Sequence, residues 1–403
     1  MTMDRQALAG GHGAAGARHL ALVESVLPVI AANAERADRE RRLTAEMVAA
    51  LHGAKLYRML LPKPFDGLEI DPLTFVQVIE AIAKVDASTA WCLCQNAVCA
   101  MTSAFIAPET ATRIFAREHT AVLAWGPGPK ARAVAVDGGY RIDGTFTFAS
   151  GGRQATWLGG FCPIVGADGQ FSRDADGAVI GRTMLFPASS ATFEDVWEVI
   201  GLRGTASDSF TVTGLFVPQD CTVARDDQAE RRYGGQLYAL PTNSMFACGF
   251  ACLSLGLARS LLDAFVGLAG DKTPRGSRQV LRDNAVVHAE VAEAEARLRA
   301  ARSYILGTLG DIWAQAQRDG ARGLTLDQRM TIRLAATFTI QQAVQVADMA
   351  YHAAGATAIF AGQPFERRFR DMHTVAQQVQ GRRAHFETVG RFMFGLEPDK
   401  TFI

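Results

Sequence analysis

Residues 131–165 read ARAVAVDGGYRIDGTFTFASGGRQATWLGGFCPIV, and short β-type runs alternate there with turn signals. Asp137-Gly138-Gly139 separates two such runs and predicts a hairpin. Asp143-Gly144 predicts a second turn before the alternating run 145–148. Further strands are expected at 157–165, 183–186, 191–199 and 209–217. Because these strands follow one another without helices between them, the pattern favours an antiparallel barrel or sandwich over a doubly wound parallel sheet.

The segments on both sides of this region have helical periodicity. Leu20, Val23, Leu27 and Ile30 recur at helical spacing near the start, and residues 329–350 form a long periodic segment near the end. An order of helices, then strands, then helices predicts an α+β protein. We expect an N-terminal helical domain at 1–120, a central β-domain at 121–226 and a C-terminal helical domain at 227–403.

The composition argues against several kinds of partner. Lysine and arginine number 41, as do aspartate and glutamate, so the formal net charge of zero gives no reason to expect nucleic acid or an anionic membrane. The apolar stretch 244–258 is too short for a membrane span and predicts a buried core helix. Seven scattered cysteines favour reduced thiols and a cytoplasmic protein. Cys248 and Cys252 lie one helical turn apart without further ligands, so no metal site is expected.

The common catalytic motifs fail. Residues 11–16, GHGAAG, match G-x-G-x-x-G, but no strand precedes them and no βαβ unit surrounds them. The chain has no P-loop, no H-E-x-x-H and no G-x-S-x-G. Kinase, zinc-protease and serine-hydrolase chemistry therefore has no support.

Three longer motifs point to one family. Residues 139–151, GYRIDGTFTFASG, resemble the flavin-contacting strand of the acyl-CoA dehydrogenase superfamily. Residues 197–209, WEVIGLRGTASDS, closed by LFVP at 215–218, resemble its second β-domain signature, and PFERRFRD at 364–371 resembles its C-terminal Arg-Asp signature. The resemblance implies an acyl-CoA dehydrogenase-like fold with a central antiparallel β-barrel or sandwich and a C-terminal four-helix bundle, assembled as a homotetramer.

The position of the expected catalytic base separates two branches of this superfamily. An acyl-CoA dehydrogenase needs a carboxylate to take the α-proton of the thioester. The two usual places read QQVQG at 377–381 and PTNSMFAC at 241–248, and neither contains one. The chain instead resembles the oxygenase components of two-component flavin monooxygenases, in AWG at 124–126, FASG at 148–151, GLRGT at 201–205 and RDMHT at 370–374.

This resemblance implies a function with defined partners. The cofactor would be reduced FMN or FAD supplied by a separate flavin reductase. With O2 it would form a flavin C(4a)-hydroperoxide and oxygenate a small aromatic, heteroaromatic or amine substrate. Two alternatives stay open: an acyl-CoA dehydrogenase or oxidase acting on a thioester, and a non-catalytic flavin-binding subunit.

The resemblance also implies a set of site residues. Ser150 stands where the family places a hydroxyl against flavin N5 and O4, and Phe148 stands where an aromatic ring packs on the flavin. Gln378 stands where many members carry a histidine, and because glutamine cannot titrate near neutrality, His373 or His385 would take that role unless the substrate needs no deprotonation. The implied catalytic residues are Ser150, His373 and Gln378; the cofactor-binding residues are Trp125, Phe148, Ser150, Gly151 and Arg275; the substrate-pocket residues are Trp91, Asn96 and Thr205.

Simpler interpretations remain for several of these residues. Phe148 would then be ordinary strand core and Ser150 a turn residue. His373 would be a helix-face residue bonded to Asp371 or to backbone, Trp91 a core side chain, and Arg275 a surface arginine instead of a flavin ligand from a neighbouring subunit.

Overall fold

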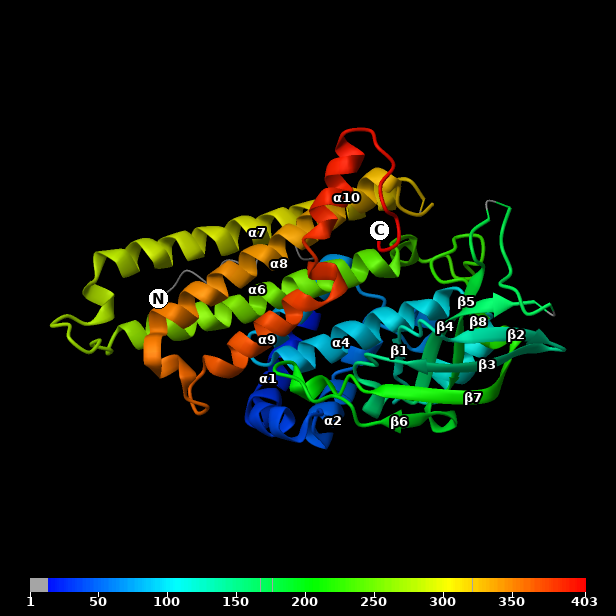
Figure 1. Cartoon of the computed structure of the whole chain (residues 1–403), viewed down its shortest axis with the longest axis horizontal. Coiled ribbons are helices and arrows are strands. Elements are labelled where there is room, and N and C mark those ends of the chain that lie inside the picture. Colours follow the sequence, from blue (N-terminus) through cyan, green and yellow to red (C-terminus); the bar gives the residue numbers. More distant parts are fainter. Residues whose placement is uncertain (1–13, 167, 176, 321) are drawn as a thin grey trace.

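The computed structural model describes residues 14–403 except 167, 176 and 321, so the start of the glycine motif at 11–16 lies outside the described residues. The chain folds in the expected order of helices, strands and helices. In Figure 1 the strands gather at one end of an elongated molecule, and the long C-terminal helices extend to the other end.

The N-terminal helices are α1 (Ala14–Glu40), α2 (Ala45–Gly53), α3 (Pro72–Ala83), α4 (Ala87–Ala100) and the short α5 (Pro108–Ala111). Polar side chains cap three of them, α2, α3 and α4. Thr44, Asp71 and Asp86 accept the N–H groups of Met47, Thr74 and Thr89, which satisfies donors that a helix leaves unpaired in its first turn.

Eight strands in the described part of the chain form one sheet. They are β1 (Leu123–Gly126), β2 (Arg132–Val136), β3 (Gly139–Phe146), β4 (Trp157–Val165), β5 (Gly181–Pro187), β6 (Thr192–Glu194), β7 (Ser209–Pro218) and β8 (Thr222–Val223). The order is β6-β7-β3-β2-β4-β5-β8, with β1 beside β4.

The sheet is mixed, which corrects the expectation of a purely antiparallel domain. β4 pairs in parallel with both β1 and β2, whereas the other neighbours are antiparallel. The cause is the connection 147–156, which leaves β3, passes β2 and starts β4 in the direction of β2. We call this connection the crossover loop.

Two local expectations were also wrong. Asp143-Gly144 is not a turn, because β3 continues through it with a bulge between Ile142 and Gly144. Gly144 is required by close packing, since a Cβ there would lie 2.6 Å from the Cβ of Ala131. The strand expected at 191–199 is limited to β6, and β1 was not foreseen.

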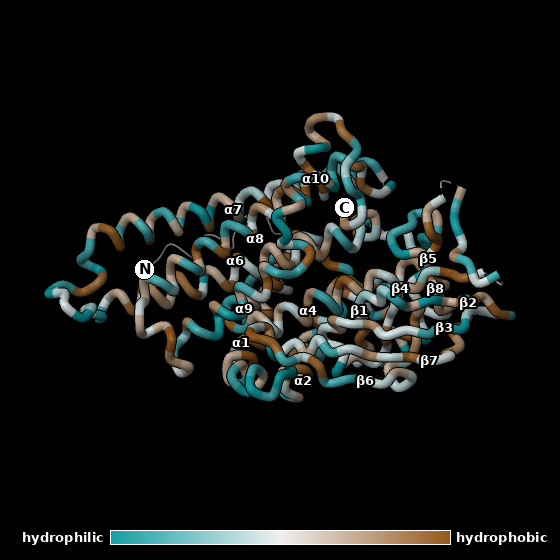
Figure 2. Tube along the Cα trace, in the orientation of Figure 1, coloured by the Kyte–Doolittle hydropathy of each residue, from teal (hydrophilic) through white to brown (hydrophobic). Residues whose placement is uncertain are grey.

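The C-terminal part consists of α6 (Thr242–Ala269), α7 (Ala285–Arg318), α8 (Leu326–Ala354), α9 (Glu366–Gln377) and α10 (Ala384–Met393). α6 is long and apolar enough to cross a membrane, yet 94% of its most apolar window is buried inside the protein. It therefore serves as the core helix that the sequence predicts. Figure 2 shows hydrophobic and hydrophilic residues alternating along α7, as expected of a helix with one face on the core.

Candidate active site

Two loops pair at the junction of the sheet and the helices. In the crossover loop, Ala149 N–H donates to the carbonyl of Asp208 and Gly151 N–H donates to the carbonyl of Thr205, both at 3.0 Å. Gly151 has φ 69°, a left-handed conformation that glycine adopts without strain. The crossover loop is thereby fixed against residues 205–208, which precede β7.

A continuous set of hydroxyl groups lies between these loops. The indole N–H of Trp91 on α4 donates to Ser150 Oγ at 2.9 Å, and Ser150 Oγ lies 2.6 Å from Ser207 Oγ. Ser207 Oγ in turn lies 2.7 Å from Thr205 Oγ1, which donates to the carbonyl of Leu202 at 2.8 Å. We call Ser150, Ser207 and Thr205 the hydroxyl relay. All three side chains are buried.

Phe148, two residues before Ser150, is exposed and strained. Its φ is 54° and 62% of its surface is accessible. A left-handed bulky residue persists only where its surroundings hold it. Here the ring of Trp197 lies edge-on to Phe148 at 6.0 Å, and the indole N–H of Trp197 donates to the carbonyl of Leu202. Phe148 therefore presents an open aromatic face instead of filling the core, unlike Phe146, which is fully buried.

An aromatic wall extends from the hydroxyl relay to β1. Trp91 stacks on Phe250 with ring centroids 4.1 Å apart, and Phe250 stacks on Phe246 at 6.0 Å. Trp125 meets Phe246 edge-on at 6.2 Å. Asn96, on the same helix as Trp91, donates to the carbonyl of Leu123, while its buried Oδ1 has no partner among the described residues.

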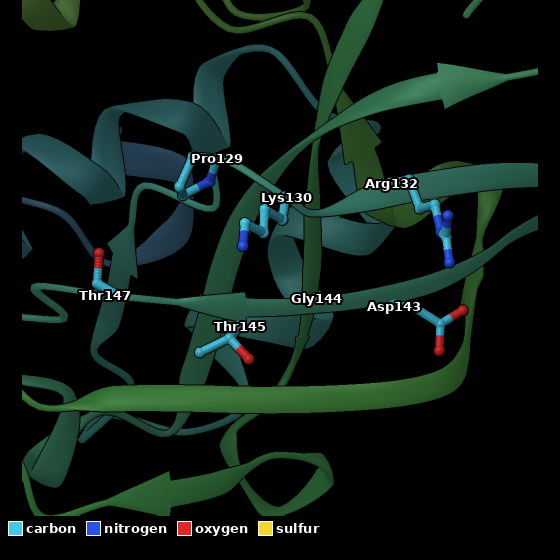
Figure 3. Close-up of a pocket in the computed structure, with 7 residues that line it drawn as sticks. All are labelled: Pro129, Lys130, Arg132, Asp143, Gly144, Thr145 and Thr147. Atoms are coloured by element: carbon cyan, nitrogen blue, oxygen red, sulfur yellow. The ribbon is translucent and has the colours of Figure 1, made fainter. Parts of the chain in front are cut away.

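A cavity of about 340 Å³ lies beside the strand that leads to Phe148. Figure 3 shows its lining residues, with Thr147 at one end and the side chains of Lys130 and Arg132 over β3. The complete lining is Pro129, Lys130, Arg132, Asp143, Gly144, Thr145 and Thr147. Asp143 Oδ1 is already engaged by the N–H of Gly214 at 2.8 Å. The lining thus carries two cations and one carboxylate, and its net positive charge suits an anionic group.

The acids in this region are committed to other partners. Asp208 accepts Arg153 Nε at 2.7 Å on one oxygen and two backbone N–H groups on the other. Asp371 on α9 accepts the N–H of Leu202 at 2.6 Å. Burial raises the pKa of Asp371 to about 7, although the Arg367 guanidinium lowers it. Among the described residues, no contact joins either carboxylate to the exposed ring of Phe148.

His373 and Gln378 make contacts outside this constellation. His373 Nε2 bonds to Asp348 on α8 at 2.9 Å and packs on Phe369, so the alternative partner Asp371 was wrong. Gln378 Oε1 accepts the N–H of Gln380 at 2.8 Å, and its buried Nε2 has no partner among the described residues. His385 Nε2 bonds to the carbonyl of Val379, and burial lowers the pKa of His385. The catalytic roles of His373 and Gln378 stay predictions.

Arg275 is exposed in the connection between α6 and α7. Figure 1 places that connection at the end of the molecule away from the sheet. Within one chain it is therefore remote from the crossover loop, and its role as a ligand from a neighbouring subunit stays a prediction.

The structure brings together Trp91, Phe148, Ser150, Gly151 and Thr205, and it joins Trp125 to them through the aromatic wall. It adds Ser207, which sequence reasoning missed. The only available signal was its position two residues after Thr205 in GTASDS.

Comparisons with known proteins agree with the motifs. The model of the acyl-CoA dehydrogenase N-terminal domain matches residues 21–114, and that of the C-terminal domain matches residues 248–381. Indole-3-acetate monooxygenase of Pseudomonas putida is 28% identical over 365 residues, covering 90% of each chain. The FADH(2)-dependent resorcinol hydroxylase oxygenase component of Rhizobium sp. (strain MTP-10005) is 26% identical over 93% of this chain and 94% of its own.

A solved structure, XiaF from Streptomyces sp. in complex with FADH2 and glycerol, has the same fold with a TM-score of 0.87. It is 23% identical, over 95% of this chain and 96% of its own. The predicted fold and the resemblance to flavin monooxygenase oxygenase components are confirmed. Because the two family models match both helical parts and together cover more than half of the chain, this protein belongs to the acyl-CoA dehydrogenase family.

Proposed function

We propose that this protein is the oxygenase component of a two-component flavin-dependent monooxygenase that acts on a small aromatic substrate. Its relatives include an indole-3-acetate monooxygenase and the oxygenase component of a resorcinol hydroxylase. One observation carries the proposal: the Ser150 hydroxyl is held in place, while the nearby carboxylates are already hydrogen-bonded to other groups. Ser150 is held by Trp91, whereas both oxygens of Asp208 are bonded within the loops.

The residues present fit a flavin. Phe148 offers an open aromatic face, and the buried Ser150 follows two residues later in the same crossover loop. Lys130 and Arg132 line a cavity that Thr147, the neighbour of Phe148 in the chain, also lines, and a phosphate would find opposite charge on these two side chains. When bound in its reduced form, a flavin supplies the two electrons that activate O2, so that one oxygen atom enters the substrate and the other leaves as water.

The protein's own residues account for the substrate class. The stacked rings of Trp91, Phe250 and Phe246 form a largely buried apolar wall beside Ser150, and such apolar surroundings favour an aromatic molecule over a polar one. A wall of this kind also keeps water away from the reacting atoms. The unpartnered Oδ1 of Asn96 offers one acceptor to a substrate N–H or O–H group.

The test is oxygen incorporation. Purified protein, reduced FMN or FAD from a separate reductase, and a panel including indole-3-acetate and resorcinol are mixed under ¹⁸O2. We expect a product that carries one ¹⁸O atom. Quantitative release of hydrogen peroxide with every substrate would contradict the proposal. Bleaching of bound oxidised flavin by acyl-CoA would support a dehydrogenase instead, and failure to hold reduced flavin would support a non-catalytic subunit.

We also propose a cytoplasmic homotetramer that receives flavin from a reductase and needs no membrane or nucleic acid. Exposed apolar side chains support assembly: Ile200, Ile359, Phe360, Met393 and Phe394 are each more than half exposed in the single chain. Seven cysteines, all free thiols, support a reducing compartment. Light scattering and cell fractionation test the two statements.

A further inference from the structure

The hydroxyl relay has a fixed direction. At one end, the indole N–H of Trp91 can only donate, and it donates to Ser150 Oγ at 2.9 Å. At the other end, the carbonyl of Leu202 can only accept, and Thr205 Oγ1 lies 2.8 Å from it. A hydroxyl has a single hydrogen, so Thr205 uses its hydrogen on Leu202 and can only accept from Ser207.

The direction at Thr205 also fixes the hydrogen positions of Ser207 and Ser150. Ser207 gives its hydrogen to Thr205 across 2.7 Å, so it can only accept from Ser150 across 2.6 Å. The one hydrogen of Ser150 is therefore used, and one of its two lone pairs receives the Trp91 N–H. What Ser150 can offer to a ligand is its remaining lone pair, which is an acceptor.

The opposite direction is unfavourable. If Thr205 turned its hydrogen to Ser207, two oxygen acceptors would face each other at 2.8 Å with no hydrogen between them. The Leu202 carbonyl would keep the N–H groups of Trp197 and Thr205 as donors, so the cost of this direction is the repulsion between the two oxygens and the lost hydrogen bond of about 1 kcal/mol.

We propose that Ser207 and Thr205 are positioning residues that make Ser150 an acceptor only, so that the site selects reduced over oxidised flavin. In a reduced flavin N5 carries a hydrogen and donates, whereas in an oxidised flavin N5 has a lone pair and accepts. Ser150 can therefore bond to the first and is repelled by the second. This inference rests on the proposed function, and it assigns a role to two residues that would not touch the flavin themselves.

The anchor of the relay is itself held in place. The N–H of Leu202 donates to Asp371, and its carbonyl also accepts the indole N–H of Trp197 at 3.0 Å. Leu202 adopts φ 51°, a left-handed backbone that these contacts stabilise. The direction of the relay is thus built into the loop.

The experiment compares Thr205→Val with Thr205→Ser. Valine has nearly the shape of threonine but no hydroxyl, so Ser207 and then Ser150 become free to reverse. Serine keeps the hydroxyl and the direction. For each protein, the dissociation constants of reduced FMN under anaerobic conditions and of oxidised FMN in air are measured, and the oxidised-to-reduced ratio is compared.

We expect Thr205→Val to lower this ratio on the order of tenfold, mainly through tighter binding of oxidised FMN. Thr205→Ser should keep the wild-type ratio. Ser207→Ala should behave like Thr205→Val, because Ser150 then loses its acceptor and can turn its hydrogen to N5. A tenfold change in the ratio lowers the midpoint potential of bound flavin by about 30 mV, which a redox titration measures independently.

Three results would overturn the inference. The first is an unchanged ratio in Thr205→Val and Ser207→Ala. The second is an equal fall of the ratio in Thr205→Ser. The third is an equal loss of affinity for oxidised and reduced FMN in the variants, which would indicate a disturbed loop. A wild-type protein that binds neither form would refute the proposed function itself, and with it this inference.

Discussion

The backbone N–H of Leu202 lies 2.6 Å from Oδ1 of Asp371, although the two residues are separated by 169 positions in the chain. Asp371 belongs to the C-terminal Arg-Asp motif, and Leu202 belongs to the loop that carries the hydroxyl relay. Two motifs that the sequence shows only as separate stretches therefore meet through this hydrogen bond and through the one from the Arg370 guanidinium to the carbonyl of Ile200. These contacts tie α9 to the loop that positions Ser150.

Replacing Asp371 by Asn should remove a pH dependence of stability. Burial raises the pKa of Asp371 to about 7 in the folded protein, against an ordinary value of 3.8. Between these values the folded protein binds a proton that the unfolded chain releases, so the stability due to this group is complete below about pH 3.8 and is lost as the pH rises to about 7. Asn keeps an acceptor for Leu202 and has no proton to lose. From pH 5 to pH 8 the variant should gain about 2 kcal/mol relative to wild type, measured by urea unfolding.

Asp137→Asn, in the exposed hairpin turn between β2 and β3, is the matched control and should stay parallel to wild type across the same pH range. Curves of wild type and Asp371→Asn that run parallel between pH 5 and pH 8 would show that Asp371 is ionised throughout.

Ser150→Ala should weaken the binding of reduced flavin and uncouple flavin oxidation from oxygenation of the substrate. The variant removes the lone pair that would accept from N5–H, and one hydrogen bond corresponds to about 1 kcal/mol, or roughly fivefold in affinity. We also expect more hydrogen peroxide to be released per reduced flavin consumed, measured beside the oxygenated product. Ser190→Ala, at an exposed serine between β5 and β6, provides the control. Unchanged affinity and coupling in Ser150→Ala would remove this residue from the mechanism.

Lys130→Met should weaken the binding of flavins that carry a phosphate and leave the binding of riboflavin unchanged. Lys130 is exposed in the cavity beside Thr147, so its attraction for a phosphate is partly screened, and we expect about a threefold loss of FMN affinity at low salt. The loss should disappear in 1 M salt. Lys63→Met, at an exposed lysine in the N-terminal helical part, should have no effect. An equal loss for riboflavin would place the phosphate elsewhere.

Local signals predicted local structure well. Thr44, Asp71-Pro72 and the glycine-rich hairpin at 137–139 mark element boundaries because capping and turn chemistry act within a few residues. Asp143-Gly144 misled because a glycine needed for close packing on Ala131 has the same letters as a turn. The parallel pairing of β4 depends on where the crossover loop travels, which no short pattern contains.

The site was predictable only as far as a motif reached. Ser150 and Phe148 lie in one motif and Thr205 in another, and resemblance placed each of them. Ser207 was missed because its importance comes from the 2.6 Å contact with Ser150, which exists only after the two loops pair. The partner of His373 was likewise hidden, since Asp348 lies on a different helix.

Gly151→Ala should destabilise the protein and displace Ser150, for two separable reasons. Its φ of 69° disfavours any residue with a Cβ, by about 1 kcal/mol. The Cβ would also lie 2.5 Å from Asn96 Oδ1, and Asn96 cannot withdraw easily because it is buried and its amide donates to Leu123. Gly169→Ala isolates the first effect, since Gly169 has φ 77° with nothing within 4 Å of its Cβ position. We expect Gly151→Ala to lower the free energy of unfolding by at least about 1 kcal/mol more than Gly169→Ala does. Gly151→Ala should also weaken the binding of reduced flavin, whereas Gly169→Ala should leave that binding unchanged. Equal destabilisation by the two substitutions would show that Asn96 yields without strain and that the crossover loop is less rigid than its hydrogen bonds indicate.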